Sequence, residues 1–520
     1  MAICNNQNIC VIIMNKNKNE LETLASGSSV TFFYRILSRI LLVGIQILIA
    51  RFFGPAIFGL YAIGWIISRM VWSFSTLGLQ NGVTKYSIKY LDKDDASFKG
   101  IVFNALTLSF FLGVIMMLIF FFGAEWIANH VYKNAELANI IKLFSLSFPF
   151  LSLLTITSSL SRISLKMEYG TIAEDFLPQI ISLIVLIILY YLGLGIYSAV
   201  ISTVLGYFIA FLVSIYFLYK LFPVLFDWSI RPNNRYKELL LFSLPTFLSV
   251  TFSFLTNRLS ALILGAYVPT SSVGVYQAAS QNIVSAGIIP SSLRIIFSPL
   301  IARLIEDNKI EEVKKIYKTS TRWVLYMNLP IFLIFWLVPS ELIVVLFGKP
   351  YVAGAAILGI LSVGQLVNTA SGAVGQLMIM TEHQKQWMWM SIGALVVNII
   401  LCFLLIPTEG LKGAAITVSS VNAILPILGV IYTKKKLNMA PYDYKIWKGI
   451  IAFTITFIML YLALNYTIIQ DQYPIIRLSF VASLGTSCFF LLLYKLGLDA
   501  EDQQVIGLVM SKIKKKKNKK

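Results

Sequence analysis

Three arginines lie deep inside apolar segments of this sequence, where a charged side chain is expensive. Arg39, Arg69 and Arg258 are each flanked on both sides by long apolar runs. An arginine at the centre of a bilayer costs about 2.5–3.5 kcal/mol on insertion scales, so such residues usually face a protein interior or water. Because a guanidinium binds phosphate or carboxylate through two parallel hydrogen bonds, the three residues predict a cationic site for an anion within a membrane.

Two further arginines and six glutamines extend the predicted site. Arg35 and Arg294 lie nearer the ends of their apolar runs, so snorkelling to the headgroups is the alternative to a binding role. At 100° per residue, Gln46 shares a helix face with Arg35 and Arg39, and Gln80 shares one with Arg69, Ser73 and Thr76. The other candidate amides are Gln277, Gln281, Gln365 and Gln376. Amides suit sugar hydroxyls, but each one singly could serve only to bond helix to helix.

An adjacent pair of carboxylates, Glu174 and Asp175, begins another apolar run. One interpretation is a site for a coupling cation. The other, which we favour, is that both carboxylates are stabilised by the dipole at the start of a helix.

Composition places the whole chain in a membrane. The sequence has 520 residues, of which 58% are hydrophobic and 13% charged, and its mean hydropathy is +0.78. Soluble domains carry about 25% charged residues. We therefore predict an all-α polytopic membrane protein, and we assign the net charge of +19 to loops on the cytoplasmic side rather than to nucleic acid binding.

The apolar runs predict about fourteen transmembrane helices. We expect them at 30–50, 57–79, 100–122, 139–160, 171–192, 195–219, 239–264, 271–300, 323–346, 354–380, 388–406, 411–433, 448–468 and 475–496. With both termini in the cytoplasm, 31 of the 43 Lys and Arg residues fall on the cytoplasmic side and 5 on the other. This asymmetry predicts a multi-pass protein of the plasma membrane with both termini inside.

An internal repeat divides the predicted helices into two lobes. RFFGPAIFGLYAIG (51–64) and LGAYVPTSSVGVYQAA (264–279) each contain a proline followed by an apolar-Gly-apolar-Tyr step. Two pseudo-symmetric lobes of six helices, plus two C-terminal helices, would follow from such a duplication. The predicted divisions are a cytoplasmic segment 1–29 (with Met14 as a second candidate start), an N-lobe 30–222, a linker 223–237, a C-lobe 238–436, helices 13 and 14 at 437–497 and a basic cytoplasmic tail 498–520.

Signals for catalysis are missing from the sequence. It contains no phosphate-binding G-x-x-x-x-G-K-[ST] loop and no G-x-S-x-G nucleophile turn, and its four cysteines and two histidines form no metal-ligand spacing. We therefore predict a transporter rather than an enzyme, with no catalytic residue, no metal and no cofactor.

The repeated motif and the sequence FGKPYVAGAAILGIL (347–361) resemble the polysaccharide flippases, the Wzx-type branch of the superfamily that includes the MATE exporters and the lipid II flippases. This resemblance implies alternating access and translocation of a polyprenyl-diphosphate-linked oligosaccharide to the outer leaflet, for O-antigen or capsule. It also implies that Arg39, Arg69, Arg258, Arg35 and Arg294 bind the anionic part of that substrate. Membrane lipids, a polysaccharide polymerase and glycosyltransferases would be partners of a monomer.

Three other functions remain open at this point. A lipid II-type flippase shares the same chemistry. An ion-coupled MATE-like small-molecule exporter would need buried carboxylates in place of the arginines. A membrane polysaccharide polymerase would need catalytic residues on an outer loop, and the loops here are short.

Overall fold

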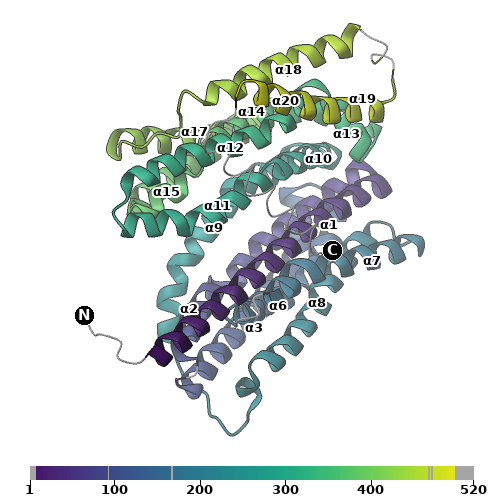
Figure 1. Ribbon diagram of the computed structural model, residues 1–520. Coiled ribbons are helices and arrows are strands. Elements are labelled where there is room, and N and C mark those ends of the chain that lie inside the picture. Colours follow the sequence, from purple (N-terminus) through teal and green to yellow (C-terminus); the bar gives the residue numbers. More distant parts are fainter. Residues whose placement is uncertain (1–6, 92, 165–167, 467–468, 470–471, 498–520) are drawn as a thin grey trace, which may run out of the picture. The chain divides into compact units, whose positions relative to one another are not determined.

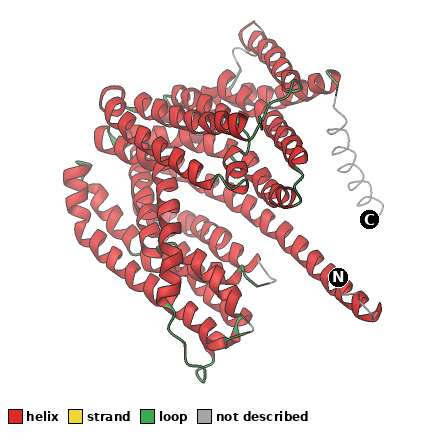
Figure 2. Cartoon of the chain, turned by 90° about the vertical axis from the view of Figure 1, so that its left-hand side faces the viewer, coloured by secondary structure: helices red, strands yellow, loops and turns green. Residues whose placement is uncertain are grey.

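The computed structural model describes residues 7–91, 93–164, 168–466, 469 and 472–497, and these form helices joined by loops, without a strand (Figure 2). The basic tail predicted at 498–520 lies outside the described residues. The all-α class predicted from composition is confirmed.

The chain divides into two compact units, Met1–Gln277 and Ala278–Lys520. The first contains α1 (Gln7–Thr76), α2 (Leu79–Tyr90), α3 (Asp95–Trp126), η1 (Ile127–Val131), α4 (Glu136–Ser145), α5 (Phe148–Ser161), α6 (Glu168–Thr171), η2 (Ile172–Phe176), α7 (Leu177–Tyr191), α8 (Ile196–Leu221), η3 (Pro223–Phe226), α9 (Tyr236–Tyr267) and the start of α10 (Thr270–Ala286). The second contains the end of α10, then α11 (Ile288–Glu306), α12 (Ile310–Leu337), α13 (Pro339–Phe347), η4 (Lys349–Tyr351), α14 (Gly354–Ala370), α15 (Val374–Met380), α16 (Gln384–Glu409), α17 (Leu411–Lys436), α18 (Ile446–Tyr466), α19 (Pro474–Phe480), η5 (Val481–Gly485) and α20 (Thr486–Lys495).

Eleven helical segments among the described residues are long and apolar enough to cross a membrane. The predicted count of fourteen differs for three reasons. The first two predicted spans appear as one segment, 33–90. The seventh, in α9, contributes only the shorter apolar stretch Arg258–Tyr267, and the eighth, in α10 and α11, is not among the eleven.

The first segment contains a break that accommodates two crossings. Residues 33–90 would extend about 87 Å as one straight helix, more than twice the ~30 Å hydrocarbon core. Within α1, Gly54 has φ 78° and ψ 178°, outside the helical region, and Pro55 follows it. A positive φ at this value is accessible to glycine and strained for other residues. The predicted turn between the first two spans is therefore located at Gly54.

In the first unit α9 packs against α1 and α2 (Figure 1). The contact runs along the helices: Thr251 Oγ1 donates a hydrogen bond to Ser73 Oγ at 3.2 Å, and Lys89 pairs with Glu238 at 2.8 Å. Gly78 and Gly82 lie against α9 so closely that a Cβ on either would overlap atoms of Ser243. We predicted a separate C-lobe at residues 238–436. Its first helix, α9, belongs to the first compact unit together with the N-terminal helices, so the boundary of the C-lobe stays a prediction.

The two copies of the repeated motif contact each other within this unit. A Cβ on Gly59 would overlap the carbonyl oxygen of Thr270, and a Cβ on Gly274 would overlap the carbonyl oxygen of Pro55. The apolar-Gly-apolar-Tyr steps around both glycines are buried in full. The glycines of the motif are therefore needed for a backbone-to-backbone contact between α1 and α10.

Corresponding helices of the two predicted lobes are interrupted. The second span breaks at Leu77 and Gly78, with φ 44° and 70°, and the eighth breaks at Gly287 between α10 and α11. The fourth breaks between α4 and α5, and the tenth breaks at Gly372, with φ 64°, between α14 and α15. Discontinuous helices at matching positions of two repeats commonly mark the substrate site of a transporter.

In the second unit, α14 packs on α17 and α12, and the C-terminal helices α18 and α20 pack together and on α12 (Figure 1). Arg322 of α12 is fully buried and pairs with Asp443 at 3.0 Å, just before α18. Arg477 of α19 pairs with Glu341 of α13 at 2.9 Å. The predicted helices 13 and 14 are thus attached to the second unit by ion pairs as well as by apolar packing.

Candidate functional site

The three deep arginines lie in the first unit. Arg39 and Arg69 are on α1, before and after the break at Gly54, and Arg258 is on α9. Arg39 is exposed, whereas Arg69 and Arg258 are half-buried. Both Arg39 and Arg69 are near enough to act on Arg258 electrostatically, as is the Tyr276 hydroxyl. The structure therefore brings together three cations that lie up to 219 residues apart in the chain.

The rings of two tryptophans, Trp65 and Trp72, lie beside the guanidiniums of Arg69 and Arg258. The guanidinium carbon of Arg69 lies 5.0 Å from the ring centroid of Trp72 and 5.7 Å from that of Trp65. The guanidinium carbon of Arg258 also lies 5.7 Å from the centroid of Trp65. These distances fall within the range at which an aromatic face attracts a cation.

Among the described residues, no carboxylate forms an ion pair with Arg39, Arg69 or Arg258. Other arginines of the chain do pair with carboxylates: Arg162, directly after α5, pairs with Glu174 at 2.5 Å, and Arg322 of α12 pairs with Asp443 at 3.0 Å. Two adjacent cations repel each other strongly where the dielectric constant is low. Arg69 and Arg258 therefore form a region of positive charge that an anionic ligand would neutralise. Arg39 adds to this region, although it also acts electrostatically on Asp175.

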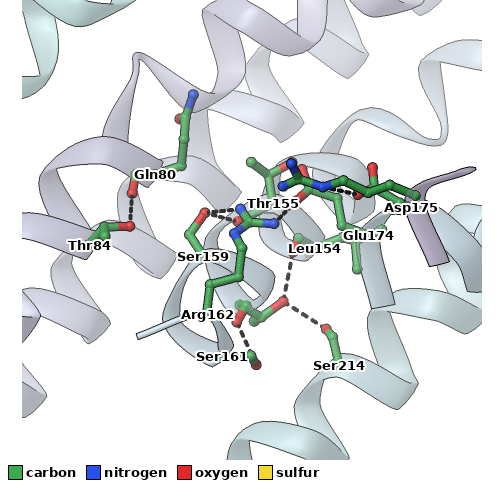
Figure 3. Close-up of polar contacts among 12 residues, drawn as sticks. Gln80, Thr84, Leu154, Thr155, Ser159, Ser161, Arg162, Glu174, Asp175 and Ser214 are labelled. Carbon is green, nitrogen blue, oxygen red and sulfur yellow. Dashed lines mark hydrogen bonds and ion pairs between the residues drawn. The ribbon is translucent and has the colours of Figure 1, made fainter. Parts of the chain in front are cut away.

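The carboxylates Glu174 and Asp175 each form an ion pair with an arginine (Figure 3). They lie on η2, where the helix contains a π-type turn. Arg162 Nη1 donates to Glu174 Oε2 and Arg162 Nη2 donates to Ser159 Oγ at 2.8 Å. Arg35 Nε lies 3.7 Å from Asp175 Oδ2. Since a cationic side chain faces each carboxylate, this geometry fits an ion-pair network better than a site for a coupling cation, and it gives Arg35 a partner within the protein.

The candidate amides divide between the units. In the first, Gln46 and Gln277 are buried and Gln80 is half-buried. The Oε1 atoms of Gln46 and Gln80 accept no hydrogen bond from any described residue. Because α1 ends at Thr76, Gln80 lies on α2 rather than on the continuous helix face expected with Arg69.

In the second unit, Gln281 and Gln365 are buried and Gln376 is half-buried. Gln365 lies on α14 and Gln376 on α15, after the break at Gly372, so these two amides are also on separate helices. Gln365 approaches the break at Gly287, where its Nε2 lies 3.9 Å from the position of a Cβ on that glycine. Arg294 is on α11, but its side chain lies outside the described residues.

Sequence reasoning missed Trp65 and Trp72 and the partner of Glu174. A signal for the tryptophans exists, because Trp65, Arg69 and Trp72 are spaced i, i+4, i+7 and so share a helix face. Arg162 lies outside the apolar runs that drew attention to the other arginines, and no local signal connects it with Glu174.

A family model described as "Polysaccharide biosynthesis protein" matches residues 48–356, more than half of the chain. The chain belongs to this family. The family predicted from the repeated motif is thereby confirmed, and the chain is a multi-pass membrane protein of polysaccharide biosynthesis.

Curated relatives of this polysaccharide biosynthesis protein include the capsular polysaccharide biosynthesis protein CapF of Staphylococcus aureus, 23% identical over 262 residues. The teichuronic acid biosynthesis protein TuaB of Bacillus subtilis (strain 168) is 22% identical over 256 residues. These alignments cover 50% and 46% of this chain. They span 65% of the length of CapF and 51% of that of TuaB.

Solved structures with the same fold include two membrane transporters. The lipid II flippase MurJ in an inward closed conformation aligns with a TM-score of 0.70 at 17% identity, over 91% of this chain and 99% of its own. A multidrug resistance MATE family transporter of the MOP superfamily, in an inward-facing conformation, aligns with a TM-score of 0.63 at 14% identity, over 77% and 94%. At these identities the likeness establishes the fold alone.

Proposed function

We propose that this protein is a flippase that moves a polyprenyl-diphosphate-linked oligosaccharide from the cytoplasmic to the outer leaflet by alternating access. Membership of the polysaccharide biosynthesis family supports the pathway, and the fold shared with MurJ and MATE transporters supports transport rather than catalysis. The protein would act as a monomer in the plasma membrane, supply a polysaccharide polymerase outside and receive its substrate from glycosyltransferases inside.

The observation that carries this proposal is the group of Arg39, Arg69 and Arg258, none of which forms an ion pair with a carboxylate within the described ranges of the chain. A lipid-linked diphosphate carries adjacent negative charges on a polar group that must cross the apolar core. Guanidiniums bind such oxygens through short charge-assisted hydrogen bonds, and the cost of holding uncompensated cations in the membrane would be offset when the anion binds. A small cationic solute, by contrast, would be repelled by the same three side chains.

The test replaces Arg39, Arg69 and Arg258 by glutamine and by lysine in cells that lack the chromosomal copy. We expect each glutamine variant to lower surface polysaccharide at least tenfold while the lipid-linked precursor accumulates, because a charge-assisted hydrogen bond contributes about 1.5–3 kcal/mol. The lysine variants keep the charge but lose the bidentate geometry, so their loss should be smaller. Surface glycan and precursor are measured by immunoblot and mass spectrometry.

Arg231→Gln, in the loop before α9, is the matched control, because its side chain is exposed. Normal export by all three glutamine variants at normal protein levels would refute the proposed site. Single repeat units on the surface in place of long chains would instead indicate a polymerase. Accumulation of wall precursors with loss of viability would indicate a lipid II-type flippase.

A further inference from the structure

Trp65 is the residue at which two cations from different helices meet. Arg69 follows it by one turn on α1, and Arg258 comes from α9. Both guanidinium carbons lie 5.7 Å from the centroid of the same indole. One aromatic side chain therefore lies beside two of the three deep arginines, and neither of these two pairs with a carboxylate among the described residues.

An aromatic support differs chemically from an acidic one. A carboxylate would accept hydrogen bonds from the N–H groups of a guanidinium and neutralise its charge, as Glu174 does for Arg162. The face of an indole attracts the cation through its quadrupole but accepts none of the in-plane N–H donors in the usual hydrogen-bonding geometry. Arg69 and Arg258 thus keep both their charge and their donors for a ligand, while the shared indole offsets part of their mutual repulsion.

A second indole, that of Trp72, also lies beside Arg69 and is itself fixed in place. Arg69 also lies over Trp72, with 5.0 Å between the guanidinium carbon and the ring centroid. Trp72 Nε1 donates a hydrogen bond to Thr155 Oγ1 of α5 at 2.9 Å, and its ring packs against the buried cluster that contains Leu151 and Leu154. Arg69 is therefore flanked by two indoles, one tied to α5 and one shared with Arg258.

We propose that Trp65 is a positioning residue that holds the guanidiniums of Arg69 and Arg258 ready to bind two adjacent phosphoryl groups. This inference rests on the proposed function, since it concerns the same arginines. It adds Trp65 to the proposed site and a preference for a diphosphate over a monophosphate. Two guanidiniums on a shared aromatic support can each bind one phosphoryl group of a diphosphate. A single phosphate gains less from the second arginine, so Trp65 should favour a diphosphate over a monophosphate.

The experiment measures binding of inorganic pyrophosphate and of orthophosphate to the purified full-length protein by isothermal titration calorimetry. We compare Trp65→Met, which keeps an apolar side chain without a π face, with Trp65→Phe, which keeps the π face. We expect Trp65→Met to weaken pyrophosphate binding about tenfold and orthophosphate binding less than threefold. Trp65→Phe should retain pyrophosphate affinity within about threefold of the wild type.

Trp447→Leu on α18 is the matched control for loss of a tryptophan, because 63% of its surface is exposed; it should bind both anions normally. If Trp65→Met does not elute as a monodisperse protein, Trp65→Leu replaces it. The inference is overturned if the apolar variant binds pyrophosphate like the wild type, if it loses both anions equally, or if Trp65→Phe loses as much as it does.

The double variant R69Q/R258Q separates this inference from the proposed function. Loss of pyrophosphate binding in the double variant, with normal binding in Trp65→Met, overturns only the role of Trp65. Normal pyrophosphate binding in the double variant overturns the anion site of the proposed function itself.

Discussion

Four arginines of the first unit fall into two chemical groups according to what faces them. Arg162 faces Glu174 and Arg35 faces Asp175, whereas Arg69 and Arg258 face indoles. A carboxylate partner neutralises a cation inside the membrane, so the first group stabilises the fold. An aromatic partner leaves the charge in place, so the second group is suited to a ligand.

This distinction predicts the outcome of a double-mutant cycle on Arg162 and Glu174. Removing one partner of a poorly solvated ion pair leaves an uncompensated charge and costs about 3–5 kcal/mol when burial is complete. Since Arg162 and Glu174 retain 28% and 22% of their side-chain exposure, we expect each single variant, R162Q or E174Q, to lose about 1–3 kcal/mol of stability after discounting for solvent. The double variant should recover most of it.

The thermal unfolding midpoint and surface polysaccharide are measured for the four proteins. Glu136→Gln is the control, since the structure places this exposed side chain in the first turn of α4. Normal export by the double variant would exclude Glu174 as an essential coupling carboxylate. A double variant that is stable but inactive would contradict the structural role that we assign to the pair.

At the residue scale, the sequence was sufficient to find the arginines but not their partners. Arg39, Arg69 and Arg258 stand out because each interrupts an apolar run. Trp65 lies beside Arg258, 193 positions away in the chain, because α1 packs against α9. Helical periodicity carries no information about such tertiary pairs. The division of the polar face at Gly78 was also missed, because a glycine in an apolar run indicates a break only weakly.

Among the elements, the contact between α1 and α10 depends on two glycines. Gly59 and Gly274 each lie against a carbonyl oxygen of the other copy of the motif. Any side chain at either position must force the helices apart, because backbone atoms cannot rotate out of the way. The sequence revealed the repeat and its glycines, but not that the two copies contact each other.

We predict that Gly59→Ala and Gly274→Ala each destabilise the protein by about 1–3 kcal/mol, the usual cost of overpacking a well-packed site. Thermal unfolding of the purified protein checks this expectation. Gly44→Ala and Gly123→Ala are the controls: both positions lie within helices, and a Cβ there meets nothing within 4 Å. These controls should be neutral or gain about 0.5–1 kcal/mol from the better helix propensity of alanine. Equal effects at all four positions would contradict the close contact.

For the whole molecule, the number of membrane crossings decides on which side the chain ends. Fourteen crossings were predicted, and eleven segments meet the criteria of length and hydropathy among the described residues. An even number returns the C-terminus to the side of the N-terminus, whereas an odd number does not. The break at Gly54 would add one crossing to the eleven, the helix α9 a second, and the predicted span divided between α10 and α11 a third. Together they would give fourteen, an even number.

Alkaline phosphatase fusions test this topology, since the enzyme is active only outside the cytoplasm. We expect fusions after Lys309 and at the C-terminus to be inactive and a fusion after Gly193, between α7 and α8, to be active. The basic residues near the first two positions hold those loops inside. The same fusions joined to a cytoplasmic reporter, such as green fluorescent protein, should give the reciprocal pattern. An active C-terminal phosphatase would exclude the fourteen-helix arrangement.

The contact between the two hairpins has one more property, which is its reciprocity. Gly59 meets Thr270 and Gly274 meets Pro55, so each glycine contacts the residue four positions before the other. A surface that binds an equivalent copy of itself in this way is isologous, the arrangement found across the twofold axis of a homodimer. The motif therefore retains, inside one chain, the geometry by which two half-length subunits would recognise each other, and a duplicated ancestor that first worked as a dimer would account for it.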